Sequence, residues 1–336
     1  MAYFWLIASI ALVISLTAPI FLRPVLTRLN VLDVPNERSS HSTPVLRGGG
    51  LGPLLAFVVA LIVLMGSISG AGRLQVGTIG AVALAAGVLG WVEDLKGIRV
   101  ALRAGLQIVI GVGAVLVLSV GVDVEWWLAA LCVLAIAGYI NVANFMDGVN
   151  GISSLHGIAV GAAYALLGVL FDEVWLVGAG VAIAASFAGF LPWNLRGGMF
   201  LGDVGSYLLG AAISVTAVAA VLAGVPVVVI CGPILIYLAD TGFTLFRRVI
   251  RGEPWSEAHR LHVYQRLTDV GLSHVSVSTI VFVFSMGALA SGLISVYGGA
   301  FWGTAISLAL YLGISSLYIS SPGILAFVAQ KRSKVR

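Results

Sequence analysis

Charge is the scarcest property of this sequence. Only 10% of its 336 residues are Asp, Glu, Lys or Arg, whereas a soluble globular domain carries about 25%. Together with 60% hydrophobic residues and a mean hydropathy of +1.09, this shortage excludes a soluble protein and predicts an integral membrane protein. The sequence also lacks a polar block long enough for a separate soluble domain, so we expect one membrane domain over residues 1–336.

Cysteine is nearly absent as well. Cys132 and Cys231 both lie within apolar runs, where small buried hydrophobic side chains are expected rather than a disulfide or a metal pair. The first apolar run has no basic residue before it and no small-residue cleavage site, unlike a signal peptide. Residues 3–22 are therefore expected to remain as a first helix.

Long apolar runs recur from one end of the chain to the other. A membrane-spanning helix needs about 20 apolar residues, and this length predicts an all-α polytopic fold with 10–11 transmembrane helices. The expected helices lie near residues 3–22, 50–70, 76–92, 104–120, 127–143, 157–171, 174–192, 204–223, 225–246, 275–296 and 300–319.

Charged residues gather on one side of this topology when the N-terminus is placed outside. All 18 Lys and Arg residues except Arg73 then fall in inner loops or the C-terminal tail, as the positive-inside rule requires. Most acidic residues follow them, and the outer ones are Asp123, Glu125, Asp172 and Glu173. A transport route would place ionisable groups at mid-membrane depth, so the pattern favours an active site at the inner face.

The inner segments carry the polar chemistry, at residues 23–50, 93–103, 144–156, 193–206 and 247–274. The stretch from Asn144 through Asp147 and Asn150 to Gly151 combines carboxylate and amide oxygens with glycines, without a basic residue. Glycine lets a backbone approach a ligand closely, and these oxygens suit a hard cation. A plain Asn/Gly turn is the alternative, but the composition favours a metal-assisted phosphate site. His156 is expected to cap or pack the next helix.

The first two inner loops have a functional and a simpler interpretation each. Arg38 and Arg47 could bind phosphate through a permanently charged fork, or could only obey the orientation rule. Glu93 and Asp94 could assist a nucleophile while Lys96 holds an anion, or could form a solvated helix end.

The last two inner loops are similarly open. Asp203 could be the N-cap of the eighth helix, or could hold a cation at an anion-binding helix N-terminus. His259 and His262 are expected on one helix face with Arg266. A third ligand for zinc is missing, so a grip on a nucleotide diphosphate is favoured over a basic segment on anionic lipid.

Taken in order, these motifs resemble the polyprenyl-phosphate N-acetylhexosamine-1-phosphate transferase family (glycosyltransferase family 4), polytopic enzymes that start glycan assembly on a lipid carrier. The similarity covers about residues 23–270. The histidine loop is similar to the branch that starts O-antigen chains, including enzymes that use 6-deoxy sugars such as N-acetylfucosamine or N-acetylquinovosamine. Three places depart from the family: Glu93 stands where many members have Asp, Asn150 replaces a second Asp, and the stretch from Asn194 before Asp203 lacks the more usual Pro-Ala pair.

The resemblance implies transfer of N-acetylhexosamine 1-phosphate from a UDP-sugar to undecaprenyl phosphate, with release of UMP, at the cytoplasmic face of a bacterial inner membrane. It implies Mg²⁺, with Mn²⁺ as a substitute, held by Asp203 and Asn144. Asp94 would orient or deprotonate the lipid phosphate beside Glu93, and Asp147 would order the site. The residues implied to bind substrate are Arg38, Lys96, Asn150, His259, Arg260 and His262.

The partners expected on the same basis are undecaprenyl phosphate, UDP-N-acetylhexosamine and membrane lipids, with a homodimer left open and no nucleic acid. A transporter of a lipid-linked or nucleotide sugar is the competing function, and it predicts substrate flux without chemical turnover. A non-catalytic scaffold is the third, and it predicts that the inner acids can be replaced together.

Overall fold

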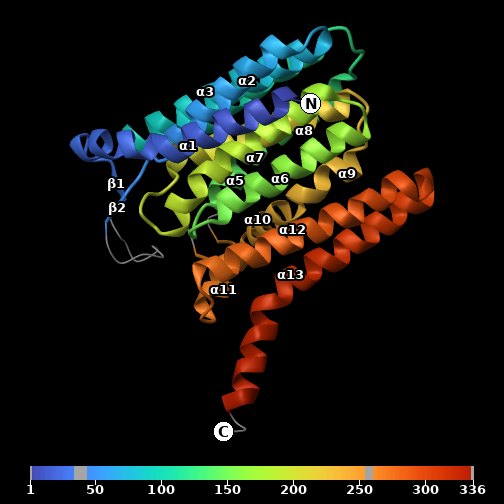
Figure 1. The fold of residues 1–336 in the computed structure, drawn as a ribbon. Coiled ribbons are helices and arrows are strands. Elements are labelled where there is room, and N and C mark those ends of the chain that lie inside the picture. Colours follow the sequence, from blue (N-terminus) through green and yellow to red (C-terminus); the bar gives the residue numbers. More distant parts are fainter. Residues whose placement is uncertain (1, 34–43, 254–259, 334–336) are drawn as a thin grey trace.

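The computed structural model describes residues 2–33, 44–253 and 260–333 as a bundle of long helices with one short hairpin (Figure 1). The helices are α1 (Ala2–Arg28), α2 (Leu51–Ser67), α3 (Ala71–Lys96), α4 (Val100–Leu118), α5 (Trp126–Phe145), α6 (Ile152–Leu170), α7 (Val174–Leu195), α8 (Gly202–Leu222), α9 (Val227–Cys231), α10 (Leu235–Ile250), α11 (Val263–Asp269), α12 (His274–Tyr297) and α13 (Thr304–Ser333). Strands β1 (Leu32–Asp33) and β2 (Val45–Leu46) pair antiparallel, with Leu32 opposite Leu46.

Apolar length decides which helices can span. Within the described ranges, ten helical segments are long and apolar enough to cross a membrane, and α9 with α10 counts as one of them. The shorter apolar helix α2 has 17 residues, which is about 25 Å of helix against a hydrocarbon core of about 30 Å. The predicted all-α polytopic class with 10–11 spans is confirmed.

One span is broken, and the last one contains a proline, features that the apolar pattern alone does not show. A 3-10 turn at Gly232–Ile234, with Pro233 in it, separates α9 from α10, because proline has no amide hydrogen to continue the helical ladder. The last helix, α13, contains Pro322. Figure 1 shows α12 and α13 together along one side of the bundle, with the end of α13 turned away from it.

Helix α8 forms the centre of the bundle. In its most apolar stretch of 18 residues, 94% of the residues are buried, whereas the corresponding share in the last span is 11%. Its backbone approaches α3 and α5 closely through glycines: a Cβ at Gly90 would lie 2.2 Å from the carbonyl oxygen of Asp203, and one at Gly210 would lie 2.6 Å from Cα of Ile140. Small residues allow such close packing in membranes, and here they fix the start of α8 between the ends of α3 and α5.

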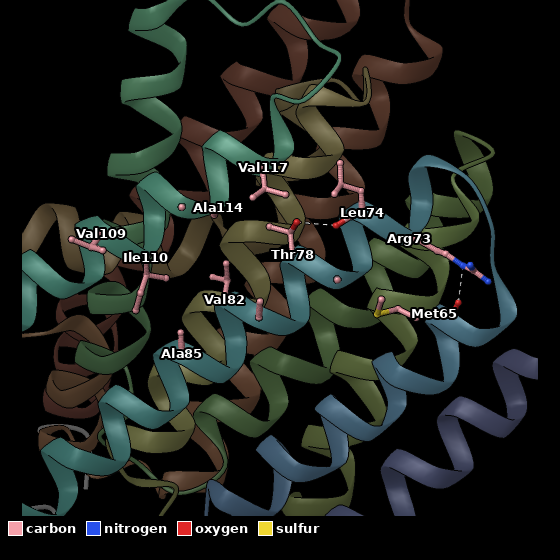
Figure 2. Close-up of a pocket in the computed structure, with 13 residues that line it drawn as sticks. Met65, Arg73, Leu74, Thr78, Val82, Ala85, Val109, Ile110, Ala114 and Val117 are labelled. Atoms are coloured by element: carbon pink, nitrogen blue, oxygen red, sulfur yellow. Dashed lines mark hydrogen bonds between the residues drawn. The ribbon is translucent and has the colours of Figure 1, made fainter.

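A cavity of about 490 Å³ lies between α2, α3 and α4 (Figure 2). Its walls are mainly apolar, and Thr78 and Arg73 are the polar side chains that line it. It is lined by the first two thirds of α3, whereas the polar cluster described below begins at Glu93, near the other end of that helix. The cavity is therefore separate from the polar cluster.

Candidate active site

A short extended segment carries Arg47 into the bundle. The amide of Arg47 donates to the carbonyl of Val31 at 3.1 Å, which continues the contact between β2 and the end of α1. On the other side, the Phe200 amide donates to the Leu46 carbonyl at 2.8 Å, and the Gly49 amide donates to the Phe200 carbonyl at 2.9 Å. The loop before α2 is thus joined to the turn before α8.

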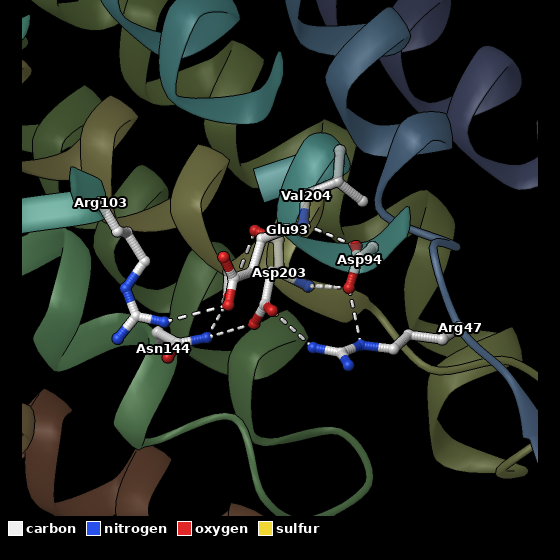
Figure 3. Close-up of polar contacts among 8 residues, drawn as sticks. Arg47, Glu93, Asp94, Arg103, Asn144, Asp203 and Val204 are labelled. Carbon is white, nitrogen blue, oxygen red and sulfur yellow. Dashed lines mark hydrogen bonds and ion pairs between the residues drawn. The ribbon is translucent and has the colours of Figure 1, made fainter. Parts of the chain in front are cut away.

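Arg47 lies between two aspartates (Figure 3). Its Nε is 2.6 Å from Asp94 Oδ1 and its Nη2 is 2.5 Å from Asp203 Oδ2. The Asp94 side chain is 0% exposed and that of Asp203 is 13% exposed. Burial lowers the pKa of Arg47, but the carboxylates of Asp203, Asp94 and Asp33 outweigh it and raise that pKa above its ordinary value. A planar, permanently charged guanidinium suits this bridging position.

Asp94 also caps helix α8. Its Oδ1 accepts from the Asp203 amide at 2.9 Å and its Oδ2 from the Val204 amide at 3.0 Å. A carboxylate is favourable at a helix N-terminus because it satisfies free amides and faces the positive end of the helix dipole. Asp203 is therefore not the N-cap: it lies in the first turn of α8, and the amides predicted to cradle an anion are held by Asp94.

Asn144 and Asp203, the two predicted metal ligands, are in direct contact. Asn144 Nδ2 donates to Asp203 Oδ1 at 2.6 Å and to Ser206 Oγ at 3.1 Å. No three His, Cys, Asp or Glu side chains group as a metal site within the described residues. However, Mg²⁺ is often held by one or two carboxylates completed by substrate phosphates. Glu93 adds a buried Oε2 without a hydrogen-bond donor among these residues, so the donor set fits such a site, and the metal assignment stays a prediction.

A second ion pair lies beside the first. Arg103 Nη1 is 3.2 Å from Glu93 Oε1, and both side chains are less than 20% exposed. Arg103 was not among the predicted site residues, because a basic residue at the start of a helix near the inner face is ordinary for a membrane protein. Lys96 is exposed at the end of α3 and makes no ion pair within the described part of the chain.

The loop between α5 and α6 holds Asp147 next to this cluster. Ser153 Oγ donates to Asp147 Oδ1 at 2.6 Å. Burial raises the pKa of Asp147 to about 6, the Ser153 hydrogen bond opposes that rise, and the charges of Asp203 and Arg47 also act on it. Asp94, Asp147 and Asp203 are thus brought together at one end of the bundle, as the sequence predicts.

The rest of that loop is fixed by hydrogen bonds to α7 and α12. Gly151, with a φ of +88°, donates its amide to Asn194 Oδ1 at 2.8 Å. The Asn150 carbonyl accepts from the Ser278 hydroxyl at 2.9 Å, and its amide lies 3.4 Å from His274 Nδ1. The backbone of Asn150 is therefore structural, whereas contact of its side chain with substrate stays a prediction.

The histidine loop differs from the expected helix. His259 and Arg38 lie outside the described residues, and α11 begins only at Val263. His262 is its N-cap and precedes the helix, so the prediction that His262 shares a helix face with Arg266 is wrong, whereas the part that concerns His259 stays a prediction. The reason is a capping box, in which the Gln265 side chain accepts from the His262 amide at 3.2 Å and which fixes the helix start.

Two predicted substrate-binding residues of that loop, Arg260 and His262, are described by the structure, and they contact different neighbours. Arg260 pairs with Asp269 at 3.1 Å. The His262 ring is 3% exposed and stacks against Phe145, with ring centroids 6.3 Å apart. Its Nδ1 is 3.0 Å from Asp240 Oδ1. Asp240 was missed as a partner, because sequence shows a lone acid near a helix end and not the loop that folds onto it.

His156 is a packing residue. Its Nε2 is 2.7 Å from the Tyr139 hydroxyl, and its ring stacks on Tyr237 with centroids 3.5 Å apart and planes 8° apart. It lies in the second turn of α6 and does not cap that helix. The packing role expected from the sequence is confirmed.

The arrangement is a set of carboxylates and arginines at the ends of separate helices, next to a glycine-containing loop. Such a set can hold phosphate groups by charge and can order a divalent cation between them. The model of glycosyl transferase family 4 matches residues 76–221, which run from α3 to the end of α8. The matched region includes Glu93, Asp94, Asn144, Asp147 and Asp203.

Several known proteins are similar over most of the chain. The probable undecaprenyl-phosphate N-acetylglucosaminyl 1-phosphate transferase of Bacillus subtilis is 29% identical over 310 residues, which cover 83% of this chain and 84% of that protein. The decaprenyl-phosphate N-acetylglucosaminephosphotransferase of Mycobacterium tuberculosis is 27% identical over 322 residues, covering 83% and 78%. The phospho-N-acetylmuramoyl-pentapeptide-transferase of Moorella thermoacetica matches over a shorter stretch. It is 33% identical over 97 residues, which cover 29% of this chain and 30% of that protein.

Proposed function

Because this chain belongs to glycosyl transferase family 4, we propose that it transfers an N-acetylhexosamine 1-phosphate from a UDP-sugar to undecaprenyl phosphate and releases UMP. The observation that carries the proposal is the Arg47 guanidinium shared by Asp94 and Asp203, with Asn144 on the second aspartate. These groups come from four separate segments of the chain. Their convergence gives a charged centre suited to phosphate chemistry.

The reaction joins two anions. An oxygen of the lipid phosphate attacks the β-phosphorus of the UDP-sugar, and the bond from that phosphorus to the bridging oxygen breaks, so that UMP leaves with the bridging oxygen. Repulsion between the reacting phosphates is the main barrier, and cationic side chains lower it by neutralising charge and fixing the in-line geometry. Arg47 and Arg103 supply permanent positive charge at this end of the bundle.

We assign Asp94 the orienting role. Its oxygens accept from Arg47 and from two amides of α8, so it holds the guanidinium and the helix start in one place. A phosphate with a second pKa near 6 is already mostly dianionic at neutral pH, so the reaction does not require a base at this position. Glu93 and Asp147 complete the carboxylate set.

Mg²⁺, or Mn²⁺ in its place, would neutralise phosphate charge when bound by Asp203 and Asn144. The remaining substrate contacts are assigned to polar residues of the segments predicted to face inward. These are Arg38, Lys96, Asn150, His259, Arg260 and His262.

We propose that the reaction takes place at the cytoplasmic face of a bacterial inner membrane. All Lys and Arg residues except Arg73 fall on that side when the N-terminus is outside, and the same topology puts the segments of Asp94 and Asp203, which are in contact, on that side. The lipid carrier would reach the site from the bilayer and the nucleotide sugar from water. The product would begin a cell-surface glycan.

Two sugars are candidates for the donor. The names of the Bacillus and Mycobacterium relatives carry N-acetylglucosamine, which supports UDP-N-acetylglucosamine. The resemblance of the histidine loop to the O-antigen-initiating branch supports a 6-deoxy amino sugar. A panel of UDP-sugars with undecaprenyl phosphate separates them through the lipid-linked product.

Purified protein tests the reaction directly. We expect UMP and lipid-linked sugar diphosphate in equal amounts, loss of both with excess chelator, and recovery when Mg²⁺ or Mn²⁺ is restored. An unchanged rate in chelator would refute the metal proposal. Uptake of nucleotide sugar into proteoliposomes without UMP release would refute the enzyme and support the transporter.

A matched pair of variants tests the assignment of Asp203. Asp203→Asn should lower turnover about 100-fold or more, since it removes charge at the proposed metal site. Asp123→Asn, in an exposed turn at the other end of the bundle, should stay within about twofold of wild type. Equal rates for the two variants would refute the assignment.

A further inference from the structure

Asp240 in α10 is buried and joins three segments of the chain. Its side chain is enclosed, since the residue is 0% exposed. Oδ1 lies 3.0 Å from His262 Nδ1 and accepts from the Val263 amide at 3.0 Å. Oδ2 accepts from the Tyr264 amide at 3.1 Å and from the Tyr318 hydroxyl at 2.8 Å. A carboxylate from one helix therefore holds the first turn of α11 and a tyrosine of α13.

A carboxylate is retained in such a place only when donors surround it. A buried charge without hydrogen bonds is strongly unfavourable, and Asp240 has donors from residues 22 to 78 positions away along the chain. The backbone amides show that Asp240 fixes where α11 begins. The Tyr318 hydroxyl shows that the last spanning helix takes part in the same contact.

The first turn of α11 in turn supports the polar loop between α5 and α6. The Tyr264 hydroxyl donates to the Phe145 carbonyl at 3.1 Å. A Cβ on Gly148 would lie 2.1 Å from that hydroxyl oxygen, so the loop fits against Tyr264 only because residue 148 is glycine. The His262 ring also stacks on Phe145. Asp147 lies between the two contacted residues, 145 and 148.

We propose that Asp240 is a positioning residue, which together with Tyr318 ties α13 to α11 and, through Tyr264, sets the place of the loop that carries Asp147. The assignment rests on the proposed function only where turnover is measured. It adds the last spanning helix, which lies outside the region matched by the family model, to the groups that hold the site in order.

The expected kinetic effect falls on the chemical step. A displacement of about 1 Å at a reacting centre can lower a rate about 100-fold without loss of binding groups. Asp240→Asn keeps the shape, but its amide NH₂ would face N–H donors on one side. We expect kcat to fall at least about tenfold while KM for the UDP-sugar stays within about threefold, which is the pattern for an interaction expressed in the transition state.

Two tyrosines of α13 provide the matched comparison. Tyr318→Phe removes only the hydroxyl that reaches Asp240, whereas Tyr311→Phe removes a hydroxyl that donates to the Val228 carbonyl at 2.7 Å. We expect about a fivefold to tenfold lower kcat for Tyr318→Phe and less than a twofold change for Tyr311→Phe. The double variant Tyr264→Phe/Tyr318→Phe should lower kcat by less than the product of the two single-variant effects, because both hydroxyls belong to the same series of contacts from α13 to the loop.

Hydrogen exchange gives a readout that does not depend on turnover. In Asp240→Asn and Tyr318→Phe, amides of residues 145–151 should lose protection, while amides of α8 keep theirs. Uniform loss across the bundle, equal kcat for the two tyrosine variants, or a rise in KM alone would each overturn the positioning role. A wild-type protein that is inactive on every UDP-sugar would refute the proposed function, and the exchange pattern would still decide this inference.

Discussion

Replacing Arg47 with methionine tests whether its guanidinium neutralises the aspartate pair. Methionine keeps much of the length of the side chain and removes the charge. Asp94, whose side chain is 0% exposed, would then keep its two amide donors from α8 but lose its cation. Asp203 would keep Asn144 alone among the donors described. Two carboxylates would face each other across an apolar side chain.

The size of the effect follows from the burial of the three groups. Removing one partner of a buried ion pair costs about 3–5 kcal/mol. Because the Arg47 side chain is 33% exposed, water screens part of this, and we expect a loss of about 2–3 kcal/mol in unfolding free energy. For a chain of 336 residues the midpoint of thermal unfolding should fall by about 3–4 °C.

Thermal unfolding in detergent, followed by tryptophan fluorescence, measures this shift, and UMP release measures activity. Adding Asp203→Asn to Arg47→Met removes one of the two facing charges, so it should recover about half of the lost stability. It should not recover turnover. Stability regained without activity would separate charge balance from catalysis.

An exposed arginine provides the control. Arg99 lies between α3 and α4 on the surface of the same end of the bundle, and Arg99→Met should change the midpoint by no more than about 1 °C. The reasoning fails if Arg47→Met and Arg99→Met have the same midpoint of thermal unfolding, or if adding Asp203→Asn lowers the midpoint of Arg47→Met further. Either result would mean that the guanidinium does not neutralise the two aspartates.

Two further predictions concern the loop and the packing around the cluster. Since burial raises the pKa of Asp147 to about 6 and the Ser153 hydrogen bond opposes it, activity that needs the ionised form should fall as pH drops through about 6. Ser153→Ala should raise that pKa and move the acidic limb of the pH–rate profile up by about one unit. Gly90→Ala should lower both the unfolding midpoint and kcat, because its Cβ would lie 2.2 Å from the Asp203 carbonyl oxygen.

Neighbouring variants serve as controls for both. Ser154→Ala removes a hydroxyl that donates to Asn194 rather than to Asp147, and it should leave the acidic limb in place. Gly105→Ala adds a Cβ that meets nothing within 4 Å, and it should leave midpoint and rate unchanged. The first prediction would be contradicted if the acidic limb of the pH–rate profile moved in neither Ser153→Ala nor Ser154→Ala. The second would be contradicted if Gly90→Ala and Gly105→Ala changed the midpoint and the rate equally.

The spans and the convergence of acids could be predicted from sequence because each rests on a local pattern. Apolar length and charge sidedness give helices and their order, and they place Asp94, Asn144 and Asp203 at one end. The partners of each side chain could not be predicted. The sequence leaves Arg47 open between a phosphate binder and an ordinary basic loop residue, and its place between two aspartates depends on a backbone pairing with residue 200.

The histidine loop shows why other contacts were missed. A spacing of three residues suits one helix face, yet the side chain of Gln265 captures the amide of His262 and starts the helix after it. Asp240 appears in sequence as one acid near the end of an apolar run. Its donors come from the start of α11 and from Tyr318, which is 78 residues further along the chain. A local sequence pattern does not predict contacts between residues so far apart in the chain.

The capping of α8 by Asp94 has a consequence for biosynthesis. The carboxylate and the amides it accepts from are 109 and 110 residues apart, so α3 enters the bilayer well before α8 has been translated. Until then Arg47 has only one of its two aspartates. The cluster of Arg47, Asp94 and Asp203 therefore cannot form on the ribosome-bound chain before α8 has inserted, and a shortened translation product ending in α7 would lack it.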